Sequence, residues 1–236
     1  MQNTKQSTEL GTLYVVATPI GNLEDITLRA IRVLKEVSLV LCEDTRHSRV
    51  LLSHHGIATK TESYHARSAD SKMEQIAKRL ESGEDLALIS DAGTPLISDP
   101  GNPLILFLNK RFGTELKIVP IPGASALTAA LSVIPVPSGR FTFIGFVPHK
   151  KGRQTAIKEM RERDDATVCY ESSHRILKLL AEFEEFFPEA RVTIARELTK
   201  QFEEIISGTA TELKTLLESK PEKQKGEFVV IVCNSL

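Results

Sequence analysis

An acidic loop rich in glycine and proline is the part of this chain with the clearest chemical potential. Residues 90–101 read SDAGTPLISDPG and follow the apolar run 86–89, which is typical of a buried parallel strand. Open α/β sheets bind their ligands at the carboxyl ends of such strands. Asp91 could pair with an ammonium group, while the small residues after it let a ligand approach the backbone. The alternative is a tight turn in which Asp91 is only a capping side chain.

Two further loops of this kind also follow apolar strands. TPIGNL at residues 18–23 comes after the expected strand 13–17, and PIPGASA at 120–126 comes after 116–119. The second loop leads into a helix expected over 124–131. A helix N-terminus exposes free N–H groups and a partial positive charge, which suit a carboxylate or a phosphate. Together these three loops, which we call elbows, predict one composite ligand site.

A charged cluster, EDTRH at residues 43–47, follows another expected strand. Asp44 is a candidate general base, because a hydroxyl group is a poor nucleophile until its proton leaves. Arg46 is a candidate for holding a phosphate or for lowering the pKa of a neighbour. The alternative is a helix N-terminus, with Asp44 or Thr45 as its cap and Arg46 in solvent.

The elements that must position these loops alternate between strand and helix in the first half of the chain. Strands are expected at residues 13–17, 39–43, 59–64, 86–90 and 116–120. Helical spacing of apolar residues predicts two helices, one through Ala30, Val33, Leu34 and Val37 and one through Met73, Ile76, Ala77 and Leu80. Ser71 and Glu74 can form a capping box before the second helix, and Gly83 can end it. Such alternation predicts a parallel sheet covered by helices.

The second half changes character after the segment VIPVPSGR. Its prolines predict a linker, which divides the chain into a flexible N-terminus (1–10), an N-terminal α/β domain (11–132), the linker (133–140) and a C-terminal α/β domain (141–236). Strands are expected at residues 141–146, 167–170, 192–197, 203–207 and 228–233. The turn near 199–201 predicts an antiparallel pair and therefore a mixed sheet. Thr209 and Glu212 predict a capping box.

Composition and missing motifs exclude several classes of protein. The chain is 41% hydrophobic and 26% charged, with a formal net charge of −1, so RNA binding would have to use local patches. GxGxxG, GxxxxGK[ST] and GxSxG are absent, and no residues have metal-ligand spacing. Three isolated cysteines predict buried free thiols in a reducing cytoplasm. The sequence predicts no signal peptide and no membrane span.

A basic run, HKKGR at residues 149–153, leads into an expected helix. Together with Arg46, Arg49 and Arg67 it could follow a phosphate backbone; the alternative is a solvated surface. Aromatic residues make up only 6% of the chain, so a broad surface for base stacking is not expected. Recognition would then depend on RNA shape and on a splayed nucleotide.

Seven motifs in a fixed order carry a family resemblance. They are TPIGNL (18–23), EDTR (43–46), SDAGTPLISDPG (90–101), PGA (122–124), YESSHR (170–175), ARELTK (195–200) and KGE (225–227). The chain resembles the small-subunit ribosomal RNA 2′-O-ribose methyltransferases of the tetrapyrrole methylase superfamily over nearly all of its length after about residue 10. Members usually continue into a small helical C-terminal region, whereas this sequence stops at Leu236. It is therefore expected to be a naturally short or a trimmed member.

The resemblance implies an α/β fold of two domains, the first with a mostly parallel sheet and the second with a mixed sheet. It implies that S-adenosyl-L-methionine lies in the cleft between them. Asp91 would take the ammonium of the cofactor, and Tyr170 and Ala195 would line the adenine slot. The expected cofactor-binding residues are Pro19, Asp91, Ala92, Gly93, Ile97, Ser98, Ser125, Ala126, Tyr170 and Ala195. No metal is expected.

The resemblance also implies the substrate, a cytidine of 16S rRNA, free or in the 30S subunit, and a symmetric homodimer. The expected catalytic residues are Asp44, Arg46 and Glu171, with Glu197 as a further candidate base. The expected RNA-binding residues are Arg46, Arg49, Lys150, Lys151, Arg153 and Arg196. Two other functions remain open: methylation of a precorrin-type tetrapyrrole or of diphthine, and a non-catalytic ribosome-binding module. The basic loop favours RNA, and the intact Asp91 loop favours catalysis.

Overall fold

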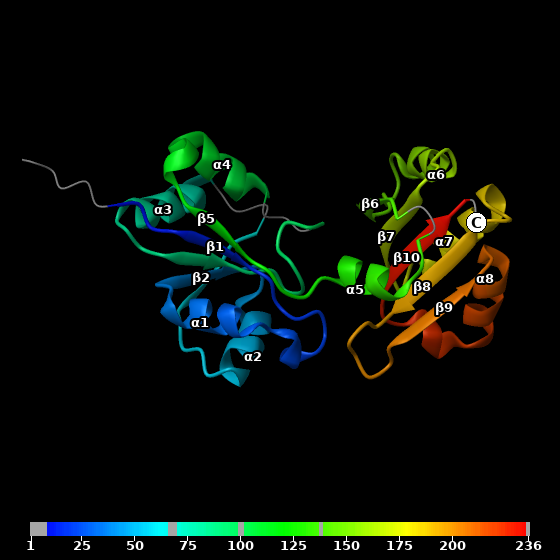
Figure 1. Ribbon diagram of the computed structural model, residues 1–236, viewed down its shortest axis with the longest axis horizontal. Helices are drawn as coiled ribbons and strands as arrows, with labels where there is room; N and C mark the ends of the chain where they lie inside the picture. The colour runs from blue at the N-terminus through cyan, green and yellow to red at the C-terminus, as the bar shows by residue number, and fades with distance from the viewer. Residues whose placement is uncertain (1–8, 66–69, 99–101, 137–138, 235–236) are drawn as a thin grey trace, which may run out of the picture. The chain divides into compact units, whose positions relative to one another are not determined.

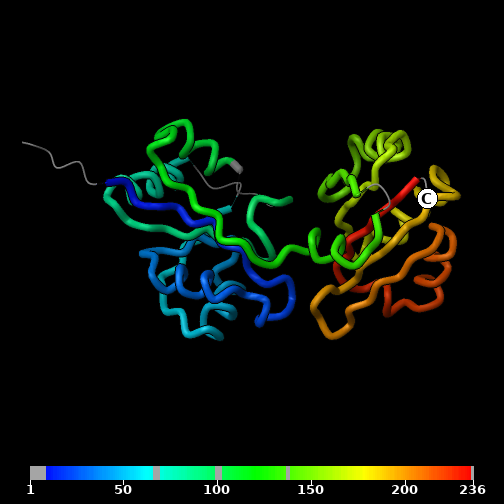
Figure 2. The backbone as a smooth tube through the Cα atoms, viewed as in Figure 1, coloured from blue at the N-terminus to red at the C-terminus, as the bar shows by residue number. Residues whose placement is uncertain are grey.

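The chain forms two compact units, each with its own five-stranded sheet (Figure 1). The computed structural model describes residues 9–65, 70–98, 102–136 and 139–234. The first unit covers Met1–Ser125 and the second Ala126–Leu236. Figure 2 shows the path of the backbone through each unit, which we describe separately.

The first unit alternates strand and helix, as the sequence predicts. Its strands are β1 (Leu13–Val16), β2 (Leu39–Cys42), β3 (Thr61–Ser63), β4 (Leu86–Leu88) and β5 (Ile118–Ile121). Its helices are α1 (Leu28–Glu36), α2 (Thr45–His54), α3 (Asp70–Glu81) and α4 (Asn102–Phe112), with short 3₁₀ helices η1 (Leu23–Asp25) and η2 (Gly113–Glu115). The strands pair in the order β3-β2-β4-β1-β5, and all pairs are parallel.

Helices cover both faces of this sheet (Figure 1). One core cluster joins the sheet to α3 and α4 through Ile76, Leu80 and Leu104. The other joins it to α1 and α2 through Leu34 and Leu52. Because both faces are covered, β2 and β4 are apolar throughout and fully buried.

The strand order brings four loops to one edge of the sheet. β2, β4, β1 and β5 are neighbours and parallel, so their carboxyl ends lie together. The loops that leave these ends carry the three elbows and the Glu43–His47 cluster, which fixes the place of the candidate site.

The second unit contains the predicted mixed sheet. Its strands are β6 (Phe141–Phe146), β7 (Ala166–Ser172), β8 (Arg191–Arg196), β9 (Glu204–Gly208) and β10 (Glu227–Cys233). Its helices are α5 (Ala126–Val133), α6 (Arg153–Arg161), α7 (Ile176–Phe186) and α8 (Ala210–Ser219), with the 3₁₀ helix η3 (Pro221–Gln224). The order is β6-β7-β10-β8-β9; β6 and β7 are parallel, and the other pairs are antiparallel.

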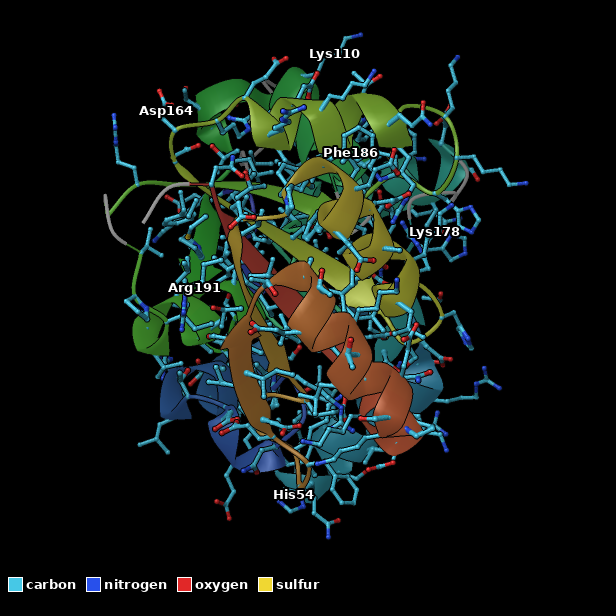
Figure 3. All side chains as sticks on the ribbon, turned by 90° about the vertical axis from the view of Figure 1, so that its right-hand side faces the viewer. His54, Lys110, Asp164, Lys178, Phe186 and Arg191 are labelled. Atoms are coloured by element: carbon cyan, nitrogen blue, oxygen red, sulfur yellow. The ribbon has the colours of Figure 1, made fainter. Side chains whose placement is uncertain are left out.

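The helices of this unit also cover the sheet. α7, which carries Lys178 and Phe186, lies beside α8 (Figure 3), and Lys214 of α8 pairs with Glu184 of α7 at 2.7 Å. A large apolar cluster with Phe183 at its centre lies between the sheet and α6, α7 and α8. A separate cluster joins α5 to β7, β8 and β10.

The place of α5 differs from the sequence prediction. The predicted first domain ran to residue 132, with a linker at 133–140, whereas Ala126 to Val133 form a helix of the second unit. Leu127, Ala130 and Leu131 pack with Ala195 and Val229 of the second sheet. The chain therefore passes between the units before α5, because the apolar face of this helix belongs to the second core.

Helix ends follow the sequence signals in two of three predicted places. Thr209 and Glu212 form a complete capping box at the start of α8. Gly83 adopts φ +84° after α3, and its N–H donates to the carbonyl of Leu80 at 3.0 Å. The box at Ser71 is wrong, because α3 already begins at Asp70 and Ser71 lies inside it.

The cysteines are free thiols in the described structure. Cys42 and Cys169 are buried, whereas Cys233 is partly exposed, contrary to the prediction that all three are buried. Burial raises the pKa of Cys169 to about 12, so this thiol stays protonated and unreactive.

Among the described helices, none combines the length and the apolar character needed to cross a lipid bilayer.

Candidate active site

Hydrogen bonds join the three predicted elbows at the carboxyl edge of the first sheet. The N–H of Thr18 donates to the carbonyl of Gly93 at 2.9 Å, and the N–H of Gly93 donates back to Thr18 at 3.0 Å. The Thr18 hydroxyl also donates to the carbonyl of Ser90 at 3.1 Å. The hydroxyl of Thr94 donates to the carbonyl of Ala124 at 3.1 Å, which ties in the third elbow. The structure thus brings together loops that lie more than 70 residues apart in the sequence.

Glycine at two positions lets these elbows approach closely. Gly93 has φ +79°, and a Cβ there would lie 3.2 Å from Cγ2 of Ile20. A Cβ on Gly123 would lie 3.0 Å from Cβ of Ala17. A side chain at either position would push the elbows apart, so the glycines are required for the geometry.

The loop after Asp91 is strained. Leu96 and Ser98 have φ of 74° and 65°, a conformation that L-residues rarely adopt. Such residues cost about 1–3 kcal/mol each and persist where the surrounding structure holds them, often at ligand sites. Ile97 between them is 43% exposed. Residues 99–101 of the motif lie outside the described residues.

A pocket of about 140 Å³ opens between α2 and two of the elbows, the one after β1 and the one after β4. It is lined by Thr18, Pro19, Gly21, Leu23, His47, Ser48, Leu51, Ile89, Ser90 and Asp91. Complete small-molecule sites usually enclose about 300 Å³ or more, so this pocket has room for one polar end of a larger ligand. Its lining is more apolar than polar, and its titratable residues are Asp91 and His47.

Asp91 contacts the start of α2. Its Oδ1 accepts a hydrogen bond from the N–H of Asp44 at 3.2 Å. This contact matches the capping interpretation of Asp91. It uses one of about four acceptor positions of a carboxylate, so the side chain can also accept from an ammonium group in the pocket.

Asp44 is the N-cap of α2, as the alternative interpretation of the charged cluster stated. Its carboxylate accepts from the N–H of Arg46 at 2.8 Å and pairs with the Arg46 guanidinium at 3.0 Å. These hydrogen bonds lower the pKa of Asp44 to about 2. A carboxylate with so low a pKa is a weak proton acceptor near neutral pH, so the geometry does not favour Asp44 as the general base. Arg46 extends into solvent, with its side chain 88% exposed.

The candidate bases of the second unit are held by cations. Glu171 is buried on β7, and its Oε1 lies 3.3 Å from Nε of Arg175 and accepts from the N–H of Ser172 at 2.9 Å. Burial raises the pKa of Glu197, but Lys200 and the N–H of Glu227 outweigh it, and the pKa lies below its usual value. The lowered pKa makes Glu197 a weaker proton acceptor, and the contacts of Glu171 fix its carboxylate inside the second unit.

Sequence reasoning missed the role of His47 and Ser48 in the pocket. Both lie on the first turns of α2 and line the pocket together with Asp91. A usable signal was present, because His47 belongs to the 43–47 cluster, which follows β2 at the same edge of the sheet as Asp91. His47 is exposed and Ser48 is buried.

The remaining predicted cofactor residues lie in several environments. Ala92 is exposed, and Ser125 immediately precedes α5, which begins at Ala126. In the second unit, Tyr170 makes edge contacts with the rings of Phe143 and Phe146, at 4.9 and 5.6 Å between centroids. Ala195 is 1% exposed and packs in the apolar cluster under α5, which fits a core residue better than the wall of a slot.

The predicted RNA-binding residues divide into exposed and buried groups. Arg46, Arg49, Lys150 and Lys151 are exposed, and Arg49 also lines a groove of about 480 Å³ beside Lys60. Arg67 lies outside the described residues.

Arg153 and Arg196 do not fit the predicted phosphate contacts. Arg153 is 3% exposed and pairs with Glu182 at 2.7 Å. Arg196 is 8% exposed and donates to the carbonyls of Lys225, Phe202 and Glu222 at 2.7, 2.9 and 3.2 Å. Both guanidinium groups are buried against partners inside the fold, so they are not available to RNA in this conformation.

Within the described residues, no group of three or more His, Cys, Asp or Glu side chains could hold a metal ion.

Known proteins resemble the chain over nearly its whole length. The family model of Tetrapyrrole (Corrin/Porphyrin) Methylases matches residues 12–214. Ribosomal RNA small subunit methyltransferase I of Xylella fastidiosa (strain Temecula1) is 46% identical over 94% of this chain and 81% of its own length. The protein of the same name from Pseudomonas aeruginosa is 47% identical over 94% of this chain and 78% of its own length.

Among solved structures, a similar fold occurs in uroporphyrin-III C-methyltransferase from Thermus thermophilus, which was solved with S-adenosylhomocysteine. The TM-score is 0.63 at 17% identity, over 94% of this chain and 97% of that chain. At this identity the likeness shows the fold alone.

Proposed function

Since this chain belongs to the tetrapyrrole methylase family, and within it to the Ribosomal RNA small subunit methyltransferase I proteins, we propose that it methylates the 2′-hydroxyl of a cytidine in 16S rRNA. It is a methyltransferase, and S-adenosylmethionine is its cofactor. The observation that supports rRNA as the substrate is the sequence identity of 46–47%, over 94% of the chain, to proteins with that name. The ribose position and the cytidine rest on the family resemblance of the motifs.

The residues of the pocket fit the amino-acid end of the cofactor. Asp91 has acceptor positions to spare for the ammonium, and Ser90 and Ser48 line the same pocket. The absence of a Cβ at Gly93 permits close approach to the backbone. When bound, the cofactor supplies a methyl group already activated by its sulfonium.

The protein's own share of the reaction is then alignment and removal of one proton. Fixing a nucleophile near the methyl group replaces a bimolecular encounter by a unimolecular step. The strained Leu96–Ser98 segment and the bonded elbows provide a rigid frame for that purpose. We assign the proton acceptor to His47, because it lines the same pocket as Asp91 and histidine is the commonest general base.

The exposed cations supply the contacts to RNA in this proposal. Lys150 and Lys151 make no ion pair with any residue that the structure describes, so both are available to phosphates. Arg46 and Arg49 lie on exposed positions of α2, the helix that carries His47. A homodimer that works in the cytoplasm on 16S rRNA or the 30S subunit completes the proposal.

Methyl transfer from tritiated S-adenosylmethionine tests the substrate. Unmethylated 30S subunits and free 16S rRNA should accept label, and a precorrin should not. Ribose methylation at one cytidine should then appear as resistance of one bond to alkaline hydrolysis. Label on the precorrin alone would establish the rival tetrapyrrole activity. Absence of cofactor binding in calorimetry would establish a non-catalytic ribosome-binding module.

A further inference from the structure

The loop between β6 and α6 presents a run of exposed basic residues. Residues 147–152 run from a buried Val147 to Gly152, and His149, Lys150 and Lys151 are exposed. Gly152 adopts φ +83° and gives α6 no side-chain cap, so the helix start itself does little to fix the loop. Within the segment, the N–H of Arg153 donates to the carbonyl of Lys150 at 3.3 Å, and further contacts come from arginine side chains.

Two arginines beneath the loop bind its backbone. Arg153, the first residue of α6, donates from Nη1 to the carbonyl of Pro148 at 3.1 Å. Arg175 donates from Nη2 to the carbonyl of Val147 and lies 3.4 Å from that of Pro148. The carbonyls just before the lysines are thus fixed from below by two guanidinium groups.

Two carboxylates, the buried Glu171 and the partly exposed Glu182, in turn hold the arginines. Nε of Arg153 donates to both oxygens of Glu182 at 2.8 and 2.9 Å. Glu171 lies between the two arginines, with Oε1 at 3.3 Å from Nε of Arg175 and Oε2 at 3.8 Å from Nη1 of Arg153. The side chains of Glu171 and Arg153 are 0% and 4% exposed. Oε2 of Glu171 has no hydrogen-bond partner among the described residues.

A buried ionic network of this kind is poor evidence for stability. Desolvation of the charges offsets much of their attraction, and apolar residues of similar volume are often as stabilising. What the network does provide is a fixed geometry for the groups it contacts. Here those groups are the backbone carbonyls that precede Lys150.

We propose that Glu171, Glu182, Arg153 and Arg175 position the 147–152 loop so that Lys150 and Lys151 bind the RNA phosphates together. This inference rests on the proposed function. Arg153 and Arg175 are positioning residues: they bind the loop backbone rather than RNA. RNA is recognised largely by shape, so fixed spacing between two cations contributes to recognition.

The first arm of the test establishes the role of the lysines. Binding of the whole protein to unmethylated 30S subunits is measured over a range of salt concentrations. Lys150→Ala with Lys151→Ala should weaken binding and reduce the salt slope by about 1.4, at about 0.7 per phosphate contact on single strands. Unchanged binding would refute the role of the loop, and the positioning inference with it, whether or not methylation of rRNA is observed.

The second arm tests positioning. Arg153→Lys keeps a cation beside Glu182 but loses the planar fork that also reaches the Pro148 carbonyl. It should raise KM for 30S subunits and reduce the salt slope like the lysine variants, with kcat and cofactor affinity unchanged. In the protein that already lacks Lys150 and Lys151, Arg153→Lys should weaken RNA binding by less than about a further twofold. Independent sites would instead show the full loss in both backgrounds, since their effects add to within about that factor.

A merely structural role predicts a different result. Additive losses in the double-mutant cycle, or a fall in kcat together with cofactor affinity, would overturn the inference and leave the proposed function standing. Arg175→Lys, which affects the same carbonyls from α7's side, repeats the cycle if Arg153→Lys does not fold. Arg111→Lys is the matched control, because Arg111 of the first unit also joins two carboxylates, Glu74 and Glu81, but makes none of the contacts to the 147–152 loop.

Discussion

Replacement of Asp91 separates the two roles that this side chain can have. In the wild type, Asp91 accepts a hydrogen bond from the N–H of Asp44 at 3.2 Å. In Asp91→Asn the amide oxygen can still accept this bond, but the negative charge is gone. In Asp91→Ala both are lost. If Asp91 pairs with the cofactor ammonium, the two variants should lose cofactor affinity alike and differ in stability.

The magnitudes follow from the contacts. A hydrogen bond to a charged group contributes about 1.5–3 kcal/mol, which corresponds to a loss of about 10- to 150-fold in cofactor affinity for both variants. In Asp91→Asn the bond from the Asp44 N–H has a neutral acceptor and still contributes about 0.5–1.5 kcal/mol to folding. Only Asp91→Ala should lose that stability, because only alanine leaves the amide at the start of α2 without its side-chain acceptor.

Calorimetric titration with S-adenosylmethionine and denaturant unfolding measure the two quantities independently. Saturated turnover should stay within a few-fold of the wild type, since the ammonium lies far from the methyl group in the cofactor itself. Wild-type affinity in Asp91→Asn would refute the reasoning and reduce Asp91 to the cap of α2.

Three further predictions address the frame, the base and the charge of the site. Gly93→Ala should destabilise the protein by more than the roughly 1–2 kcal/mol that a positive φ costs alanine, because the new Cβ would lie 3.2 Å from Ile20. Gly56→Ala is the control: Gly56 has φ +62° and nothing within 4 Å of the added Cβ, so denaturant unfolding should show the cost of the positive φ alone. His47→Gln should lower saturated turnover about 10²-fold with cofactor affinity unchanged; wild-type single-turnover activity would place the base elsewhere. The stability that Asp44 contributes through its lowered pKa should be fully present above about pH 4 and disappear as the pH falls toward 2. Asp44→Asn keeps the cap, so it should reduce the pH dependence of the unfolding free energy over that interval only.

The sequence predicted the frame of the site because the frame depends on local signals. Apolar runs at β1, β4 and β5, each followed by glycine or proline, are readable without knowledge of long-range contacts. Parallel pairing then forces the loops to the same edge. The error at α5 has the opposite origin: its apolar residues show a helix, but nothing local says which sheet they cover.

Charged side chains were less predictable, because their role depends on what lies opposite. Lys151 and Arg153 are two residues apart in one basic run, yet one is exposed and the other is 3% exposed against Glu182. The partner of Arg153 lies 29 residues away on another helix, so no spacing rule could reveal it. The two interpretations of Asp44 stayed open for a related reason: Arg46 lowers the pKa of Asp44, which suits a helix cap and disfavours a base.

The division between Lys151 and Arg153 also has a physical basis in the two side chains. A guanidinium offers five donors in a fixed plane, so it can satisfy a carboxylate and a backbone carbonyl at once and tolerate burial. An ammonium is a compact, strongly hydrated charge, which is costly to bury but ready to contact a phosphate at the surface. In the 147–153 segment each cation therefore occupies the position that its chemistry favours. The buried Arg153 binds the loop backbone and so positions the exposed Lys150 and Lys151.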